Sequence, residues 1–306
     1  MNAIETNHLT RRFGRTEAVH DLTLDVPTGS IFALLGANGA GKTTTIKMLM
    51  NLVAPTSGGA RVLGVDSRKL SPRERAQIGY VSENQQLPLW MSVQQFLDYC
   101  RPFYPTWDRA LEKSLLEQFA LPVGQKLKHL SRGMLMKAAL LSSLAYRPKL
   151  LVLDEPFSGL DPLVRDEFVR GLLEVSAQGA WTILVSSHDI EEVERLCDRV
   201  ALLNAGTLQF VEPTENLLRR FRRIEVGLTG RAESLASAPA PAHWREIEET
   251  GALVRFVDSR YDAEASEAEL RRRFPGAAVR AREMTLREIF VSIGRGDRAT
   301  LKGANV

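Results

Sequence analysis

The hydrophobic pattern of the chain predicts an α/β protein. Short and mostly apolar runs at residues 31–35, 77–81, 149–153 and 181–186 have the length and composition of strands that are buried in a sheet. Segments with helical spacing separate these runs. Because strands and helices alternate, we expect a parallel sheet whose strands are joined by right-handed crossovers.

Four segments fall outside this alternation. Residues 3–8 and 19–26 alternate between apolar and polar positions, which predicts an antiparallel pair of strands. Residues 87–147 carry helical spacing without a strand pattern, so we expect a helical insertion in the α/β domain. Residues 200–210 predict a hairpin that turns close to Gly206.

The pattern changes again after residue 218. Residues 219–295 predict a small α+β domain, and a capping box that begins at Thr285 starts a last helix that should end by Gly294. The strands of this domain are expected near residues 224–228, 245–248, 253–257 and 277–282, with a helix near 265–274. We therefore expect a first domain over residues 2–218 and a disordered tail over residues 296–306.

The composition is that of an ordinary globular protein. Of the 306 residues, 44% are hydrophobic and 25% are charged, and the length suits about two domains of roughly 150 residues each. The net charge of +3 is too small to indicate nucleic acid, so no such partner is expected. Cys100 and Cys197 form no C-x-x-C pair and are interpreted as inert residues of a reducing compartment. The N-terminus lacks the pattern of a signal peptide, and no apolar run is long enough to span a bilayer.

Residues 36–44 contain the chemistry around which the chain is organised. Gly36, Gly41, Lys42 and Thr43 fill the fixed positions of a G-x-x-x-x-G-K-[ST] phosphate-binding loop. Glycines let backbone N–H groups turn toward phosphate oxygens, the lysine reaches the β- and γ-phosphates, and the threonine hydroxyl binds Mg²⁺. An incidental glycine-rich turn is the alternative, but a strand before the loop and a helix after it favour nucleotide binding. The loop residues expected to contact the nucleotide are Gly36, Asn38, Gly39, Ala40, Gly41, Lys42, Thr43 and Thr44.

The apolar run at residues 149–153 is followed by two carboxylates, Asp154 and Glu155. In a P-loop enzyme an Asp at this strand end holds Mg²⁺, and we assign that role to Asp154. Glu155 would then point to the other side and polarise a water for in-line attack on the γ-phosphate. An acidic pair that only caps the following helix is the structural alternative.

With these motifs in order, residues 2–218 resemble the ATP-binding cassette (ABC) family. The sequence LSRGM at residues 130–134 is similar to the family signature LSGGQ, and SGLD at residues 158–161 is similar to the D-loop. His188 stands at the position of the switch histidine, and Phe13 stands where the family places an aromatic residue against adenine. The resemblance implies a P-loop cassette that binds ATP and Mg²⁺ and hydrolyses ATP, with Lys42, Glu155 and His188 as the catalytic residues.

The resemblance also implies two kinds of partner. In the family, two cassettes sandwich two ATP molecules, so Ser131, Gly133 and Asp161 are expected to contact the ATP of a second ATP-binding subunit. Without the family, Ser131 would be interpreted only as a helix N-cap. A separately encoded transmembrane permease is the other expected partner, docked on the aromatic-rich residues 96–107, which places the chain at the cytoplasmic face of the membrane. A single cassette with a small C-terminal domain resembles the bacterial ABC-2 type exporters.

The chain departs from the family pattern in two places. Arg132 and Met134 replace the Gly and Gln of the signature, and Glu83 replaces the usual Gln after residues 78–81. Glu83 can still supply an oxygen to Mg²⁺ or to the attacking water, so it is included with Thr43 and Asp154 as an expected metal ligand.

Two other functions are compatible with a phosphate-binding loop. Cassette ATPases that act on DNA or ribosomes usually have two cassettes or a long coiled coil, and this chain has neither. A P-loop kinase would need an acceptor site and a lid, and the signature, D-loop and switch histidine would then have no purpose.

Overall fold

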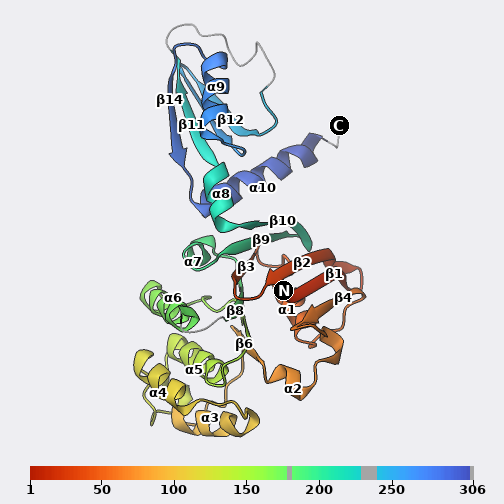
Figure 1. The fold of residues 1–306 in the computed structure, drawn as a ribbon, viewed down its shortest axis with the longest axis vertical. Coiled ribbons are helices and arrows are strands. Elements are labelled where there is room, and N and C mark those ends of the chain that lie inside the picture. Colours follow the sequence, from red (N-terminus) through yellow and green to blue (C-terminus); the bar gives the residue numbers. More distant parts are fainter. Residues whose placement is uncertain (178–180, 229–239, 304–306) are drawn as a thin grey trace. The chain divides into compact units, whose positions relative to one another are not determined.

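The computed structural model describes residues 1–177, 181–228 and 240–303 (Figure 1). The chain divides into two compact units, Met1–Val211 and Glu212–Val306. The division therefore lies before residue 218, where the sequence placed it, and helix α8 (Thr214–Arg220) belongs entirely to the second unit. Contacts of Arg220 attach α8 to the second unit, because its guanidinium binds the Glu212 carboxylate and the carbonyl of Ser259, both in that unit.

A six-stranded sheet forms the centre of the first unit. Its strand order is β10-β9-β3-β8-β7-β6. The neighbouring pairs β9–β3, β3–β8, β8–β7 and β7–β6 are parallel. The strands are β3 (Ile31–Leu35), β6 (Ile78–Ser82), β7 (Leu150–Asp154), β8 (Thr182–Ser187), β9 (Arg199–Asn204) and β10 (Thr207–Pro213). These pairings confirm the expected parallel sheet. Every residue of β3, β7 and β8 is buried, as is typical of strands in a parallel sheet.

A second sheet of the first unit is antiparallel, with the order β2-β1-β4-β5. Its strands are β1 (Asn2–Phe13), β2 (Thr16–Pro27), β4 (Ser57–Val62) and β5 (Val65–Asp66). The pairing of β1 with β2 confirms the expected antiparallel pair. The sequence analysis missed β4, because glycines are depleted in strands. Gly58 permits it: a Cβ there would lie 2.1 Å from the His8 carbonyl oxygen of the neighbouring strand β1.

Helices fill the insertion and connect the strands. The insertion contains α3 (Val93–Cys100), α4 (Arg109–Gln118) and α5 (Arg132–Leu144), which lie together in Figure 1. The other helices of the first unit are α1 (Lys42–Leu49), α2 (Pro72–Arg75), α6 (Pro162–Ala177) and α7 (Ile190–Glu194). Side-chain caps from Ser92, Asp108 and Ser131 start the three helices of the insertion.

The second unit contains an antiparallel sheet with the order β12-β13-β11-β14. Its elements after α8 are β11 (Arg222–Gly227), β12 (Trp244–Thr250), β13 (Leu253–Asp258), α9 (Ala263–Arg273), β14 (Ala278–Glu283) and α10 (Leu286–Gly303). Trp244 stacks on Phe256 with a centroid separation of 4.0 Å, and Leu270 and Phe274 complete this core from α9 and the residue after it. This is the α+β arrangement that the pattern of residues 219–295 predicted.

The C-terminal helix is longer than predicted. The capping box forms, since the Glu288 N–H donates to Thr285 Oγ1 and the Thr285 N–H donates to the Glu288 carboxylate. However, α10 continues past Gly294 to Gly303, so the tail expected over residues 296–306 is helical over most of its length. Gly costs only about 1 kcal/mol in a helix interior, which does not force a stop. Residues 304–306 lie outside the described part of the chain.

Within the described ranges, no helix combines the length and the apolar character that crossing a bilayer requires.

The core of the second unit gives a stability prediction. Replacing Trp244 with Ala removes the ring that stacks on Phe256, and we expect the free energy of unfolding of this unit to fall by about 3–5 kcal/mol. Ile247→Ala on the same strand is the control, because Ile247 is 37% exposed and should cost much less. Urea unfolding followed by circular dichroism measures both. Equal losses in the two variants would contradict the assigned core.

Candidate nucleotide-binding site

The loop between β3 and α1 has the geometry of an anion site. Gly41 has a φ of 102°, and a Cβ there would lie 2.4 Å from the Ala18 carbonyl oxygen, so only glycine fits. Gly41 is also the N-cap of α1, and it supplies no side-chain hydrogen bond to the first turn. The N–H groups that begin α1 are therefore available to an anion, with the positive end of the helix dipole behind them.

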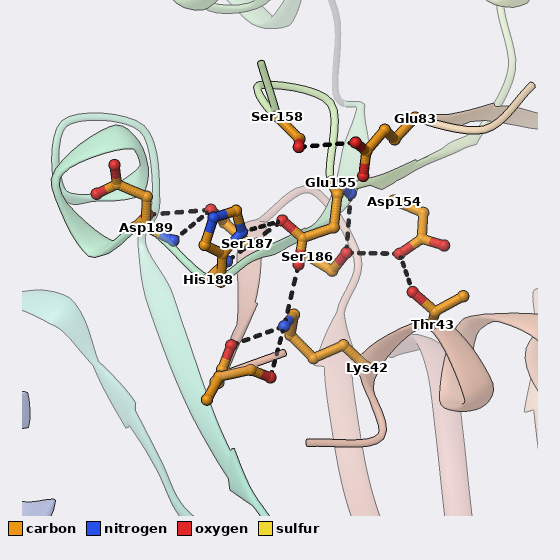
Figure 2. Close-up of polar contacts among 12 residues, drawn as sticks. Lys42, Thr43, Glu83, Asp154, Glu155, Ser158, Ser186, Ser187, His188 and Asp189 are labelled. Atoms are coloured by element: carbon orange, nitrogen blue, oxygen red, sulfur yellow. Dashed lines mark hydrogen bonds and ion pairs between the residues drawn. The ribbon is translucent and has the colours of Figure 1, made fainter. Parts of the chain in front are cut away.

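Lys42 lies folded against this loop. Its side chain is only 5% exposed, and its Nζ donates to the Gly36 carbonyl at 2.6 Å and to the Ala37 carbonyl at 3.1 Å. The same Nζ forms an ion pair with Glu155 Oε1 at 3.0 Å. The ammonium group is therefore placed where the loop glycines and the acidic strand end meet (Figure 2).

Asp154 joins the loop to the end of strand β7. Its Oδ1 accepts a hydrogen bond from the Thr43 hydroxyl at 3.0 Å and one from the Ser186 hydroxyl at 2.8 Å. Burial raises the pKa of the Asp154 carboxyl above its usual value, although the two hydroxyl donors act in the opposite direction. A buried carboxylate beside a hydroxyl offers the hard oxygen ligands that Mg²⁺ prefers.

Glu155 occupies the centre of the polar network in Figure 2. Its φ of 53° lies in the left-handed region, and its N–H donates to the Ser186 hydroxyl at 3.0 Å. The carboxylate binds Lys42 through Oε1 and His188 through Oε2, where His188 Nδ1 lies at 2.7 Å. The strained backbone and the two side-chain partners fix the direction of this carboxylate.

Glu83 lies beside this network, but its carboxylate has other partners. Its N–H donates to the Asp154 carbonyl at 3.0 Å, which holds the backbone next to the acidic strand end. Its Oε1 accepts from the Ser158 hydroxyl at 2.8 Å and from Arg132 Nη2 at 2.6 Å. Of the three expected metal ligands, Thr43 and Asp154 are therefore hydrogen-bonded to each other. The third, Glu83, is paired with Arg132.

Four other predicted residues take local structural roles. Phe13 is 48% exposed, with the Arg11 guanidinium 4.3 Å from the centroid of its ring. Ser131 caps α5 by accepting from the Met134 N–H, and Asp161 accepts from the Val164 N–H at the start of α6. The fourth residue, Gly133, packs against Val164, since a Cβ on Gly133 would lie 2.4 Å from Val164 Cγ1. Among the described contacts, none joins these four residues to the network around Glu155.

The remaining loop residues differ in exposure, and Ala40 is buried at 4% exposed. Asn38 and Gly39 are exposed, Thr44 is half-buried, and the Ala40 N–H donates to the Ala37 carbonyl at 3.0 Å. Sequence reasoning missed Ser186, which bonds both Asp154 and the Glu155 backbone. A polar residue at the end of an apolar strand was the available indication.

The chain is similar in sequence to known ATP-binding proteins. Residues 19–158 match the sequence model of the family described as ABC transporter. The uncharacterized ABC transporter ATP-binding protein YhaQ of Bacillus subtilis (strain 168) is 37% identical over 65% of this chain and 67% of its own length. The sulfate/thiosulfate import ATP-binding protein CysA of Escherichia coli (strain K12) is 33% identical over 71% of this chain and 62% of its own length.

A solved structure gives the same result for the fold. The ATP binding subunit of an ABC transporter superimposes with a TM-score of 0.64 at 29% identity, covering 71% of this chain and 92% of that one. The P-loop cassette fold expected from the sequence is thereby confirmed.

The pKa of Asp154 leads to a prediction about stability. Because the folded-state pKa is raised, the charged carboxylate costs folding free energy above that pKa, and the cost disappears as the pH falls toward 3.8. We therefore expect Asp154→Asn, whose Oδ1 can still accept from Thr43 and Ser186, to increase the free energy of unfolding at pH 7. The gain should shrink as the pH is lowered, as measured by urea unfolding without nucleotide.

Asp66→Asn provides the control with the opposite sign. The hydrogen bond from Arg68 lowers the pKa of Asp66 to about 2, so its charged form stabilises the fold above pH 3.8. This variant should lose stability at pH 7, and the loss should vanish as the pH falls toward 2. A loss of stability in Asp154→Asn at neutral pH would contradict the assignment of a destabilising buried charge.

Proposed function

The chain belongs to the ABC transporter family of ATP-binding proteins, which hydrolyse ATP, and we propose that it energises an ABC-2 type exporter whose membrane permease is a separate chain. The observation that carries the catalytic part of this proposal is the position of Glu155. Its carboxylate lies between the loop lysine and the histidine at the end of β8. A carboxylate held in this way beside a phosphate-binding loop is suited to orient a water.

Each residue of the site then has a definite task. The N–H groups at the start of α1 and the Lys42 ammonium bind the phosphates of ATP. Thr43 and Asp154 would hold Mg²⁺, which when bound would neutralise charge on the phosphate oxygens. The Lys42 ammonium exchanges Glu155 for phosphate, and this exchange leaves Glu155 Oε1 available to a water. His188 keeps Glu155 oriented through Oε2.

The remaining predicted residues act between two chains in this proposal. Ser131, Gly133 and Asp161 contact the ATP of a second ATP-binding subunit, and Phe13 stacks on the adenine of the ATP in its own chain. The support for Phe13 is the 48% exposure of its side chain, together with the sequence resemblance. The support for the other three is the sequence resemblance of the signature and the D-loop.

A cavity in the first unit is the proposed docking place of the permease. It has a volume of about 310 Å³, and its aromatic lining includes Phe96, Tyr104 and Tyr146, with Tyr104 stacked on Tyr146 at 3.8 Å. The exposed rings of Tyr99 and Phe103, which are 56% and 64% accessible, belong to the same helical insertion. Exposed aromatic residues next to an apolar hollow suit a partner's amphipathic helix.

Import is the second candidate for the direction of transport, since CysA is named for import. The single cassette followed by a small α+β unit supports the exporter instead, by resemblance. Uptake and efflux of the partner permease's substrate in vesicles containing the purified complex separate the two directions.

Glu155→Gln tests the catalytic assignment. Gln keeps the size of the side chain but cannot accept a proton, so we expect kcat for ATP hydrolysis to fall on the order of 10²–10⁴-fold while ATP still binds. Glu167→Gln is the matched control, because Glu167 also pairs with a buried lysine, Lys137, at 2.6 Å. Normal turnover by Glu155→Gln in a phosphate-release assay would refute the role of Glu155.

Phe103→Ala tests the permease interface. When the tagged chain is recovered from native membranes in mild detergent, we expect the variant to retain at least about tenfold less of a polytopic membrane protein than the unsubstituted chain. Ile247→Ala, which changes an exposed apolar residue of the second unit, should retain the normal amount. Recovery of the unsubstituted chain with ribosomes or DNA would instead support the alternative of an ABC-type ATPase acting on nucleic acid.

A further inference from the structure

Three segments that are distant in the sequence meet at the carboxylate of Glu83. Glu83 follows strand β6, Arg132 is the first residue of α5, and Ser158 lies in the turn after strand β7. Glu83 Oε1 accepts from Arg132 Nη2 at 2.6 Å and from Ser158 Oγ at 2.8 Å. Figure 2 shows the Glu83–Ser158 contact beside Asp154 and Glu155. This contact set therefore connects the helical insertion to the catalytic strand end.

The backbone around Ser158 is adapted to this contact. Gly159 has a φ of 66°, and a Cβ built on it would lie 2.2 Å from Arg132 Nη1. The guanidinium therefore lies directly against the glycine backbone, in space that any other side chain would occupy. The planar group is in this way held between Gly159 and the Glu83 carboxylate.

Two of the residues that depart from the family pattern, Arg132 and Glu83, are parts of one interaction. Arg132 stands in place of a glycine and Glu83 in place of a glutamine, and their charges cancel at 2.6 Å. A carboxylate without this partner would add a negative charge next to Asp154 and Glu155. The net charge of the Arg132–Glu83 ion pair is zero, as it would be for the glycine and glutamine of the family pattern. The hydrogen bond between the two charged groups is shorter and stronger than one made by a glutamine amide.

The contact set ends at the catalytic glutamate. The Ser158 N–H donates to the Glu155 carbonyl at 3.3 Å, so the turn that carries Ser158 begins at Glu155. On the other side, Ser186 holds the Glu155 N–H. With φ at 53°, the Glu155 backbone needs restraint from both sides to keep its carboxylate aimed.

We propose that Arg132 and Glu83 are a positioning pair for Glu155. Arg132 orients Glu83, Glu83 holds Ser158, and Ser158 fixes the turn that directs the Glu155 carboxylate. The pair acts on turnover and leaves the phosphate-binding loop untouched, because neither residue has a described contact with residues 36–44. The inference rests on the proposed role of Glu155, and is independent of the direction of transport.

A double-mutant cycle on the full-length chain tests the pair, with Glu83→Gln, Arg132→Ala and the double variant. Each single variant should lower kcat by about fivefold, and the double variant should be no slower than the slower single variant, because all three lose the same interaction. The dissociation constant of ATP, measured by titration with a fluorescent ATP analogue, should stay within about twofold, since the loop contacts remain. Arg132→Lys should recover part of kcat, because it keeps the charge.

Arg147→Ala is the control for a purely structural effect. Arg147 follows α5 and binds Asp108 at 2.8 Å, with side-chain exposures of 51% and 27% that match the 50% and 28% of Arg132 and Glu83. Arg147→Ala and Arg132→Ala should shift Tm by similar small amounts, but only Arg132→Ala should lower kcat.

Three outcomes would overturn the pair. They are equal kcat values for Arg132→Ala and Arg147→Ala, a double variant whose loss is the product of the single losses, and a weakened ATP affinity that accounts for the lost activity. A wrong assignment of Glu155 is distinguished by a separate measurement. In that case Glu155→Gln would hydrolyse ATP at the normal rate, independently of the kcat values in the double-mutant cycle.

Discussion

Parallel hydrogen bonding among β3, β7 and β8 is the constraint on which the site depends. The register pairs Leu35 with Ser187 and Asp154 with Ser186, so the carboxyl ends of the three strands lie level at one edge of the sheet. The loop after β3 carries the lysine, the end of β7 carries two carboxylates, and the end of β8 carries Ser186 and His188. In open α/β sheets this edge is where ligands bind, because the chain leaves each strand there and can turn side chains toward a common point.

The ion pair between Lys42 and Glu155 follows from that geometry. Both side chains are nearly buried, and removing two charges from water is costly unless each finds a partner. Here the loop carbonyls and His188 supply the additional hydrogen bonds. A phosphate is a competing partner for the lysine, so the proposed function has a physical basis in an exchange between two anions at one ammonium group.

The Glu83 contact set extends the same logic to the helical insertion. The insertion is held to the sheet by packing, and the polar contacts of Glu83 add a direct connection between the start of α5 and the turn after β7. In the sequence, its residues Glu83, Arg132 and Ser158 belong to three separate segments. A carboxylate in place of an amide and an arginine in place of a glycine are single departures in sequence, but in space they compensate each other in charge.

The sequence by itself determined the fold class, the phosphate-binding loop and the acidic strand end. These features depend on local order, since an apolar run, a glycine pattern and a following helix lie within a few residues of one another. It failed at β4, a glycine-containing strand that pairs with β1 and β5, and at α10, where Gly294 did not end the helix. Only the tertiary structure decided that Ser186 binds Asp154, that Lys42 binds Glu155 and that Arg132 cancels the charge of Glu83. Those contacts join residues 32, 113 and 49 positions apart, and sheet register and helix packing bring them together, which no local pattern records.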